Sequence, residues 1–116
     1  MSEIKALKQK LDVSSMYDAI VGFPKQIKTA FSIMENWNPK HKYSNINNIL
    51  ILGMGGSAIG GDVTRVLIQN ECGVPILVNR SYNIPKWVNE NTLVLASSYS
   101  GNTEETLSAF HQCTQA

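Results

Sequence analysis

Apolar side chains recur at helical spacing in the first forty residues. Ile4, Leu7 and Leu11 lie three or four positions apart with lysines between them, and the same spacing returns over residues 27–34. Side chains three and four positions apart share one face of an α-helix, so the pattern predicts amphipathic helices. Pro24 suits the first turn of the later helix, where an N–H group has no intrahelical partner.

Beyond residue 47 the pattern changes to short apolar runs that are rich in branched side chains. These runs are Asn48–Leu52, residues 75–78 and Thr92–Ala96. Continuous runs of this length are typical of parallel strands covered on both faces. Two predicted helices each have an apolar face, made of Ile59, Val63, Val66 and Leu67 in the first and of Leu107, Phe110 and Cys113 in the second. Alternating strands and helices predict an α/β fold around a parallel sheet, with right-handed crossovers.

The helical and the alternating patterns meet in a polar stretch. Residues 36–39, Asn-Trp-Asn-Pro, end the helical pattern, and residues 40–47 have the composition of a linker. We therefore expect an N-terminal helical region at residues 1–42 and an α/β domain at residues 43–116.

Composition and charge narrow the function classes. The chain has 116 residues, of which 43% are apolar and 16% charged, as expected of one globular domain at most. Residues 1–42 carry seven basic against four acidic side chains, and residues 43–116 carry three against five. This asymmetry is too mild to predict binding to nucleic acid.

The cysteines and the N-terminus indicate a cytoplasmic protein. Cys72 and Cys113 are widely spaced and form no disulfide or metal-ligand motif. The charged N-terminus lacks the apolar core of a signal peptide, and no stretch is long enough to span a bilayer. We expect no metal site and no membrane partner.

Hydroxyl side chains crowd the turn between the third apolar run and the second predicted helix of this half. Ser98, Ser100 and Thr103 lie where a helix start presents unpaired N–H groups and a partial positive charge. Capping needs one such residue, so the excess of hydroxyls predicts a pocket for an anion such as phosphate. Glu104 and Glu105 are typical partners of the helix dipole rather than catalytic carboxylates.

A glycine-rich segment follows the first apolar run. Five of the nine residues 53–61 are glycine, which predicts a loop that lets a ligand approach the backbone at Gly55 and Gly56. Ser57 supplies the only polar side chain in the segment. Carboxyl ends of parallel strands share one sheet edge, so this segment and residues 98–103, here called the serine loop, are expected to form one site.

A nicotinamide-cofactor domain is an alternative, because Gly53, Gly55 and Ala58 match the pattern G-x-G-x-x-A. That pattern expects an acid at the end of the second strand, where this chain has Arg80. Arg80 leaves three roles open: contact with an anionic substrate, a dimer interface, or a surface ion pair.

Histidines and aromatic residues give weaker evidence of a functional site than the two loops do. His41 and His111 have no matching catalytic partner in the sequence, so we read both as locally bonded or solvated. Tyr99 lies in the serine loop and, like the other aromatic residues, is expected to pack rather than to stack on a sugar.

Three segments together resemble the sugar isomerase (SIS) domain, and within it the bifunctional phosphoglucose/phosphomannose isomerase family. They are Gly53-Met-Gly-Gly-Ser-Ala-Ile-Gly-Gly61, Arg80-Ser-Tyr-Asn-Ile-Pro-Lys-Trp87 and Ser98-Tyr-Ser-Gly-Asn-Thr-Glu-Glu-Thr-Leu107. The resemblance implies a three-layer sandwich with a five-stranded parallel sheet, of which this chain holds three strands, and a second similar domain downstream.

The resemblance also implies a function. Family members are homodimeric isomerases of carbohydrate metabolism that interconvert glucose or mannose 6-phosphate and fructose 6-phosphate without a cofactor. Their catalytic glutamate and histidine fall beyond residue 116, so no catalytic residue is assigned and this chain alone is expected to be inactive. Sugar-phosphate binding is assigned to Gly55, Gly56, Ser57, Ser98, Ser100 and Thr103. The alternative is a regulatory SIS domain that binds a sugar phosphate without catalysis.

Overall fold

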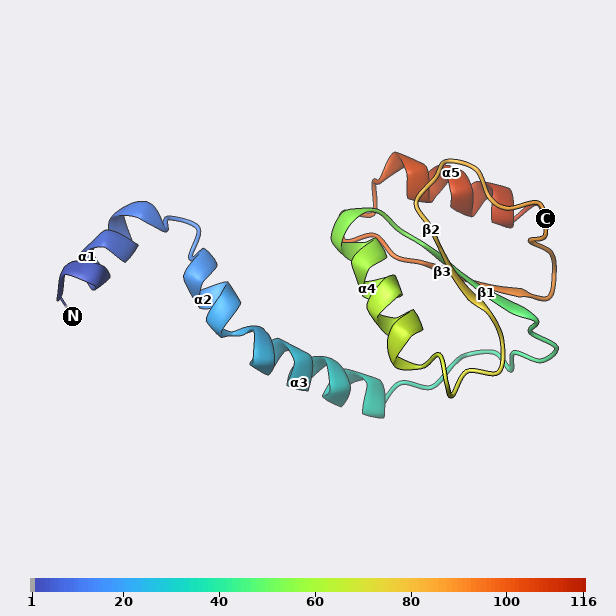
Figure 1. Cartoon of the computed structure of the whole chain (residues 1–116), viewed down its shortest axis with the longest axis horizontal. Coiled ribbons are helices and arrows are strands. Elements are labelled where there is room, and N and C mark those ends of the chain that lie inside the picture. Colours follow the sequence, from blue (N-terminus) through green and yellow to red (C-terminus); the bar gives the residue numbers. More distant parts are fainter. Residues whose placement is uncertain (1) are drawn as a thin grey trace. The chain divides into compact units, whose positions relative to one another are not determined.

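The computed structural model describes residues 2–116. These residues divide into two compact units, one that ends at Lys42 and one that begins at Tyr43 (Figure 1). We call them the N-terminal unit and the α/β unit.

The N-terminal unit consists of helices, as the sequence pattern predicts. They are α1 (Ser2–Leu11), α2 (Met16–Val21) and α3 (Phe23–Glu35). Pro24 lies in the first turn of α3. Asp12 accepts hydrogen bonds from the backbone N–H groups of Met16 and Tyr17, at 2.7 and 2.9 Å, and so satisfies donors at the start of α2. Neither α2 nor α3 buries any residue, so their apolar stripes remain exposed.

The α/β unit is built on a parallel sheet. Its elements are β1 (Asn48–Leu52), α4 (Gly55–Leu67), β2 (Ile76–Asn79), β3 (Thr92–Ala96) and α5 (Glu104–Cys113). The strand order is β2-β1-β3, with β1 parallel to both neighbours. The three predicted apolar runs are therefore confirmed as strands, and β2 lies one residue further along the chain than predicted.

Helices cover both faces of the sheet (Figure 1). On one face, Leu50 and Leu52 are fully buried and cluster with Val88 and with Ala109 of α5. On the other face α4 packs so closely that a Cβ atom at Gly61 would lie 3.0 Å from Ile51 Cγ2. Both faces of β1 are thus covered, which explains its uninterrupted apolar sequence.

The glycine-rich segment is not the loop that we predicted. Helix α4 begins at Gly55, so most of the segment forms the first turns of a helix. Within the segment, only Gly55 has a positive φ, at +51°. Small side chains are needed there because they bring α4 close to the sheet: Ala58 and Gly61 are the buried residues of the helix.

The predicted apolar faces of the two helices are also not the faces that meet the sheet. Each helix packs through small residues, and its larger apolar side chains are exposed, at 41% or more. The exposed residues are Ile59, Val63, Val66 and Leu67 of α4, and Leu107 and Phe110 of α5. Cys113, in contrast, packs partly buried against the core, as an apolar face would.

None of the helices within residues 2–116 is long and apolar enough to cross a membrane. The same residues contain no group of three or more histidine, cysteine or acidic side chains that could hold a metal ion.

Candidate functional site

The carboxyl ends of the strands bring the two predicted loops together. Leu52, the last residue of β1, pairs with Ala96 of β3 on one side and with Asn79 of β2 on the other. The N–H of Ser97 donates to the Leu52 carbonyl at 2.8 Å. A Cβ atom at Gly53 would lie 3.2 Å from the Ser97 carbonyl oxygen, so the chain after β1 directly contacts the chain after β3.

The serine loop gathers three hydroxyl groups at the start of α5. Ser98 Oγ lies 3.0 Å from Thr103 Oγ1 and 3.5 Å from Ser100 Oγ, and Ser100 Oγ lies 3.4 Å from Thr103 Oγ1. The three side chains come from the two ends and the middle of the loop, so the loop folds back on itself. Each hydroxyl is one donor with two acceptor positions, and together they can surround a small anion.

Backbone groups hold this loop in shape. The N–H groups of Gly101 and Asn102 donate to Ser98 Oγ and Ser100 Oγ, at 3.1 and 3.2 Å. Gly101 has φ +72°, a conformation that glycine adopts without steric cost. Turn formation therefore explains one hydrogen bond of Ser98 and one of Ser100.

Helix capping does not explain the hydroxyl of Thr103. Thr103 is the N-cap residue of α5, but its side chain makes no capping hydrogen bond. The first-turn N–H groups of a helix lack intrahelical partners, and here the serine loop stands directly before them. One turn later, Thr106 is 5% exposed, and its Oγ1 has no hydrogen-bond partner among the described residues.

The start of α4 forms the other part of the site. No side chain caps this helix, whose N-cap residue is Met54. A Cβ atom at Gly55 or Gly56 would meet nothing within 4 Å, so the space beside this turn is open. Ser57 is partly buried in the same turn. Two helix starts thus lie at one sheet edge, and both favour negative charge.

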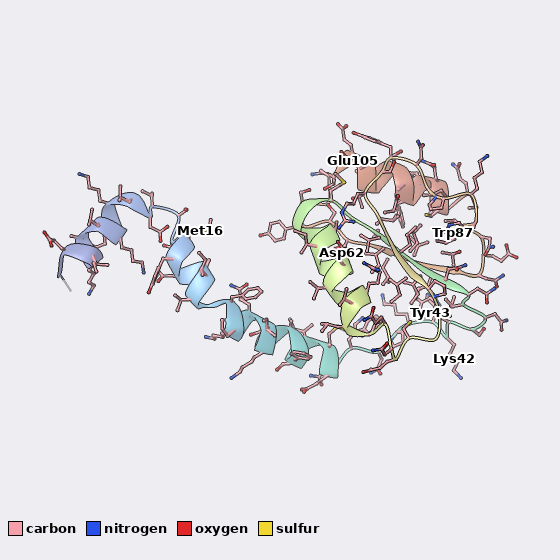
Figure 2. The ribbon with its side chains drawn as sticks, viewed as in Figure 1. Met16, Lys42, Tyr43, Asp62, Trp87 and Glu105 are labelled. Carbon is pink, nitrogen blue, oxygen red and sulfur yellow. The ribbon has the colours of Figure 1, made fainter. Side chains whose placement is uncertain are left out.

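Acidic residues follow the serine loop, and a tyrosine from another segment reaches them. Glu104 and Glu105 lie in the first turn of α5, as expected of partners of the helix dipole (Figure 2). The phenol of Tyr82 donates to Glu104 Oε2 at 3.3 Å. The negative charge of Glu105, then burial, then Glu104 raise the pKa of Tyr82 above its usual value. Tyr82 therefore keeps its proton at neutral pH.

One of the three roles left open for Arg80, the surface ion pair, is present in the structure. Its guanidinium forms a surface ion pair with Asp62 of α4. In the dinucleotide alternative this guanidinium would accept a ribose phosphate, and Asp62 would compete with that phosphate for it. The structure thus gives the cofactor alternative no support beyond the glycine pattern.

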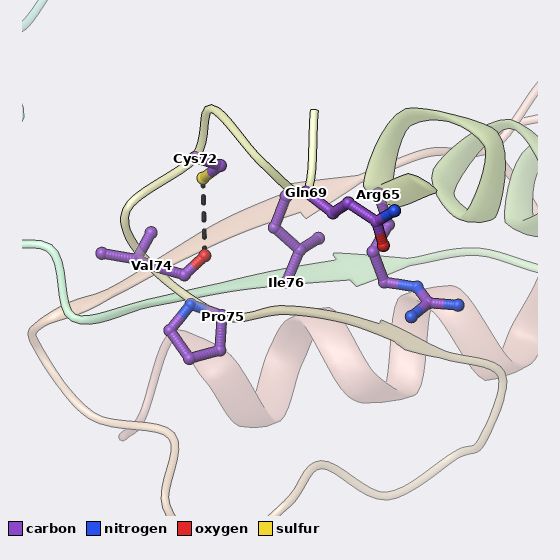
Figure 3. A pocket seen from close by; sticks show the side chains of 6 residues that line it. All are labelled: Arg65, Gln69, Cys72, Val74, Pro75 and Ile76. Atoms are coloured by element: carbon purple, nitrogen blue, oxygen red, sulfur yellow. Dashed lines mark hydrogen bonds between the residues drawn. The ribbon is translucent and has the colours of Figure 1, made fainter. Parts of the chain in front are cut away.

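A hollow of about 250 Å³ lies elsewhere (Figure 3). It is lined by Arg65, Gln69, Cys72, Val74, Pro75 and Ile76. Ile76 is the first residue of β2, so this hollow lies at the opposite end of that strand from the serine loop. The thiol of Cys72 donates to the Val74 carbonyl at 3.4 Å. The predicted phosphate site and this hollow are therefore separate features.

Sequence reasoning missed the contact between Tyr82 and α5. Tyr82 and Glu104 are 22 positions apart, and no local pattern brings them together. A usable signal was the polar spacing Glu104, Ser108, Gln112 along α5, because side chains four positions apart share one face of a helix. His111 lies in the last turn of α5, at the end of the helix away from the serine loop.

Several relatives of the chain share one name. A bifunctional phosphoglucose/phosphomannose isomerase of Caldicellulosiruptor bescii is 47% identical over 95 residues, which is 82% of this chain. The enzyme of the same name from Thermoplasma acidophilum is 40% identical over 87 residues, or 75% of this chain. The chain is homologous to part of the bifunctional phosphoglucose/phosphomannose isomerases.

More distant relatives carry another name. The glutamine–fructose-6-phosphate aminotransferase (isomerizing) of Corynebacterium efficiens is 35% identical over 68 residues, which is 56% of this chain and 11% of that protein. The match spans 28% and 27% of the lengths of the two bifunctional isomerases described above. No protein-family model and no solved structure matches the chain. The resemblance inferred from the three sequence segments is confirmed.

Proposed function

We propose that this chain binds the phosphate group of a hexose phosphate and that, within a longer enzyme, it serves aldose–ketose isomerisation. The substrates would be glucose or mannose 6-phosphate and fructose 6-phosphate. The proposed ligands are Ser98, Ser100 and Thr103 in the serine loop, and Gly55, Gly56 and Ser57 at the start of α4. The cluster of three hydroxyls, 3.0 to 3.5 Å apart at a helix start that no side chain caps, carries the proposal.

The names of the relatives support the choice of ligand. Two groups of relatives, the bifunctional isomerases and the aminotransferases, are named for reactions of hexose phosphates. A phosphate monoester would receive hydrogen bonds from the hydroxyls and from the N–H groups of two helix starts, and both helix dipoles would stabilise its charge.

Phosphate binding has a clear part in such a reaction. A phosphate held at the serine loop fixes the position of the sugar relative to the groups that move its protons. Binding energy from this remote group is then used to orient the reacting carbons. The residues proposed here would bind and orient the sugar phosphate, and they would not transfer protons.

A calorimetric titration of the chain tests the proposal. We expect binding of fructose 6-phosphate and of inorganic phosphate, and no binding of NAD or NADP. Binding of a dinucleotide in preference to phosphate would overturn the proposal in favour of the cofactor alternative. Sugar-phosphate binding by the longer protein without isomerase turnover would instead support a regulatory SIS domain.

A further inference from the structure

A polar stripe on α5 holds the segment that follows β2. The stripe consists of Glu104, Ser108 and Gln112, each four positions from the next. Gln112 Nε2 donates to the Tyr82 carbonyl at 2.7 Å, and Ser108 Oγ donates to the same carbonyl at 3.2 Å. The N–H of Ile84 donates to Gln112 Oε1 at 3.4 Å. The backbone around Tyr82 is thus fixed to the middle and the end of α5.

The side chain of Tyr82 reaches the other end of the same helix. Its phenol donates to Glu104 Oε2, and Glu104 directly follows Thr103 of the hydroxyl cluster. Asn79 holds the start of the segment, because its Nδ2 donates to the carbonyls of Ser81 and Asn83 at 3.1 and 3.2 Å. Tyr82 therefore lies beside the anion site and is anchored at both its backbone and its hydroxyl.

The negative charge of Glu104 would oppose anion binding at this position. A carboxylate that can rotate freely beside the serine loop would repel a phosphate. It could also accept hydrogen bonds from the hydroxyls and helix N–H groups that would bind the phosphate. A hydrogen bond from a neutral phenol gives the carboxylate a fixed partner on the face of α5 that Ser108 and Gln112 share.

We propose that Tyr82 is a positioning residue of the anion site, which holds the Glu104 carboxylate away from the hydroxyl cluster. This inference rests on the proposed function, since it assumes that the cluster binds phosphate. In this proposal the Glu104 carboxylate would compete with phosphate for the hydroxyls if Tyr82 did not hold it. Ser108 and Gln112 of the stripe on α5 position the phenol of Tyr82.

Affinity for inorganic phosphate and fructose 6-phosphate, measured by calorimetry on the full chain, tests the proposal. Tyr82→Phe removes only the hydroxyl, and we expect it to weaken binding by about threefold to tenfold, as expected when a unit charge moves a few ångströms closer to the anion. Glu104→Gln in the Tyr82→Phe background should restore the wild-type affinity or exceed it. Tyr17→Phe, which removes a phenol from the N-terminal unit, should change nothing.

The rescue separates positioning from general damage to the fold. If Tyr82→Phe weakened binding only by loosening the segment after β2, it would weaken binding equally in the wild type and in a Glu104→Gln background, and the proposal would be wrong. Unchanged phosphate affinity in Tyr82→Phe would overturn it as well. Wild-type chain that binds no phosphate would overturn the proposed function together with this inference, whereas wild-type binding without the rescue would overturn the inference alone.

Discussion

The hydroxyl of Thr103 makes different contacts from those of a helix cap. A capping threonine accepts a hydrogen bond from a first-turn N–H, but Thr103 contacts the hydroxyls of Ser98 and Ser100 instead. The helix start is left without a side-chain acceptor, and such a start binds anions. At the scale of single residues, the candidate site therefore combines a helix start that no side chain caps with three hydroxyls that can turn their O–H groups toward an anion.

Removing these donors should weaken phosphate binding. We expect Ser100→Ala and Thr103→Ala each to cost about 1.5–3 kcal/mol of binding free energy, the range for a hydrogen bond to a charged group. Calorimetric titration with inorganic phosphate measures the loss. Ser44→Ala, at an exposed serine before β1, is the matched control and should bind as the wild type does. Unchanged affinity in the Ser100→Ala/Thr103→Ala double variant would show that the serine loop is a turn that does not bind phosphate.

The pKa of Tyr82 should depend on the acidic side chains around it. Glu105→Gln should lower the pKa of the phenol, because the charge of Glu105 is the largest single cause of the raised value, and Glu104→Gln should lower it as well, because both the charge and the hydrogen bond of Glu104 raise it. NMR titration of ¹³C-labelled tyrosine measures both.

The same raised pKa has a consequence for stability. The folded chain holds the phenolic proton more tightly than the unfolded chain, whose value is near 10.0. The resulting stability is present below pH 10 and is lost as pH rises through the folded-state pKa. Tyr82→Phe should therefore lose less stability than the wild type above pH 10. An equal loss in both proteins would contradict the assignment.

At the scale of elements, α4 is placed by its smallest residues. Gly61 meets Ile51 and Val78, so the helix backbone lies close to β1 and β2. A Cβ atom at Gly60, one position earlier, would meet nothing within 4 Å. Of these two adjacent glycines, Gly61 lets the helix pack closely against the sheet, whereas Gly60 has room for a side chain.

Substitution of the two glycines should separate these roles. Gly61→Val should lower the free energy of unfolding by about 1–3 kcal/mol, because its methyl groups overfill the space between α4 and the sheet. Gly60→Val should be close to neutral, since valine is a slightly better helix former than glycine. Urea unfolding of both variants measures the difference. Equal stability of the two variants would show that α4 can move away from the sheet without cost.

The strands were predictable from the sequence, and the glycine-rich helix was not. Residues 48–52 and 92–96 are strands because a sheet covered on both faces selects unbroken runs of branched apolar residues. Glycine has poor helix propensity, so close packing rather than local preference makes residues 55–61 helical. The apolar stripe of α4 predicted the wrong buried face for the same reason: close packing requires small residues, and the helix meets the sheet through Ala58 and Gly61.

The candidate site was predictable only in its local part. Several hydroxyls between a strand and a helix indicate an anion loop, because strand, loop and helix follow one another in the chain. The contacts of Tyr82 with Glu104 and Gln112 span 22 and 30 positions. They depend on the path of an irregular connection between β2 and β3, which no periodic pattern specifies.

At the scale of the whole molecule, much apolar surface remains exposed. In the α/β unit, Leu95 of β3 is 47% exposed, and the face of α4 formed by Ile59, Val63, Val66 and Leu67 is 52–73% exposed. Both β2 and β3 are edge strands of the three-stranded sheet, with unpaired backbone groups on their outer sides. Contiguous apolar patches and open edges of this kind favour association.

We therefore expect the chain to self-associate in solution. Light scattering at several concentrations should show a mass that rises with concentration. Val63→Lys/Val66→Lys should shift the protein toward the monomer, because two charges on the exposed face of α4 resist burial against a second copy. Thr64→Lys/Gln69→Lys adds the same charge at exposed polar positions and is the matched control. A wild-type chain that stays monomeric and unfolds cooperatively at all concentrations would contradict this expectation. It would show that the exposed apolar surface and the open sheet edges do not cause association. Association that persists equally in both lysine variants would instead place the contact away from α4, at a sheet edge or on the exposed stripes of α2 and α3.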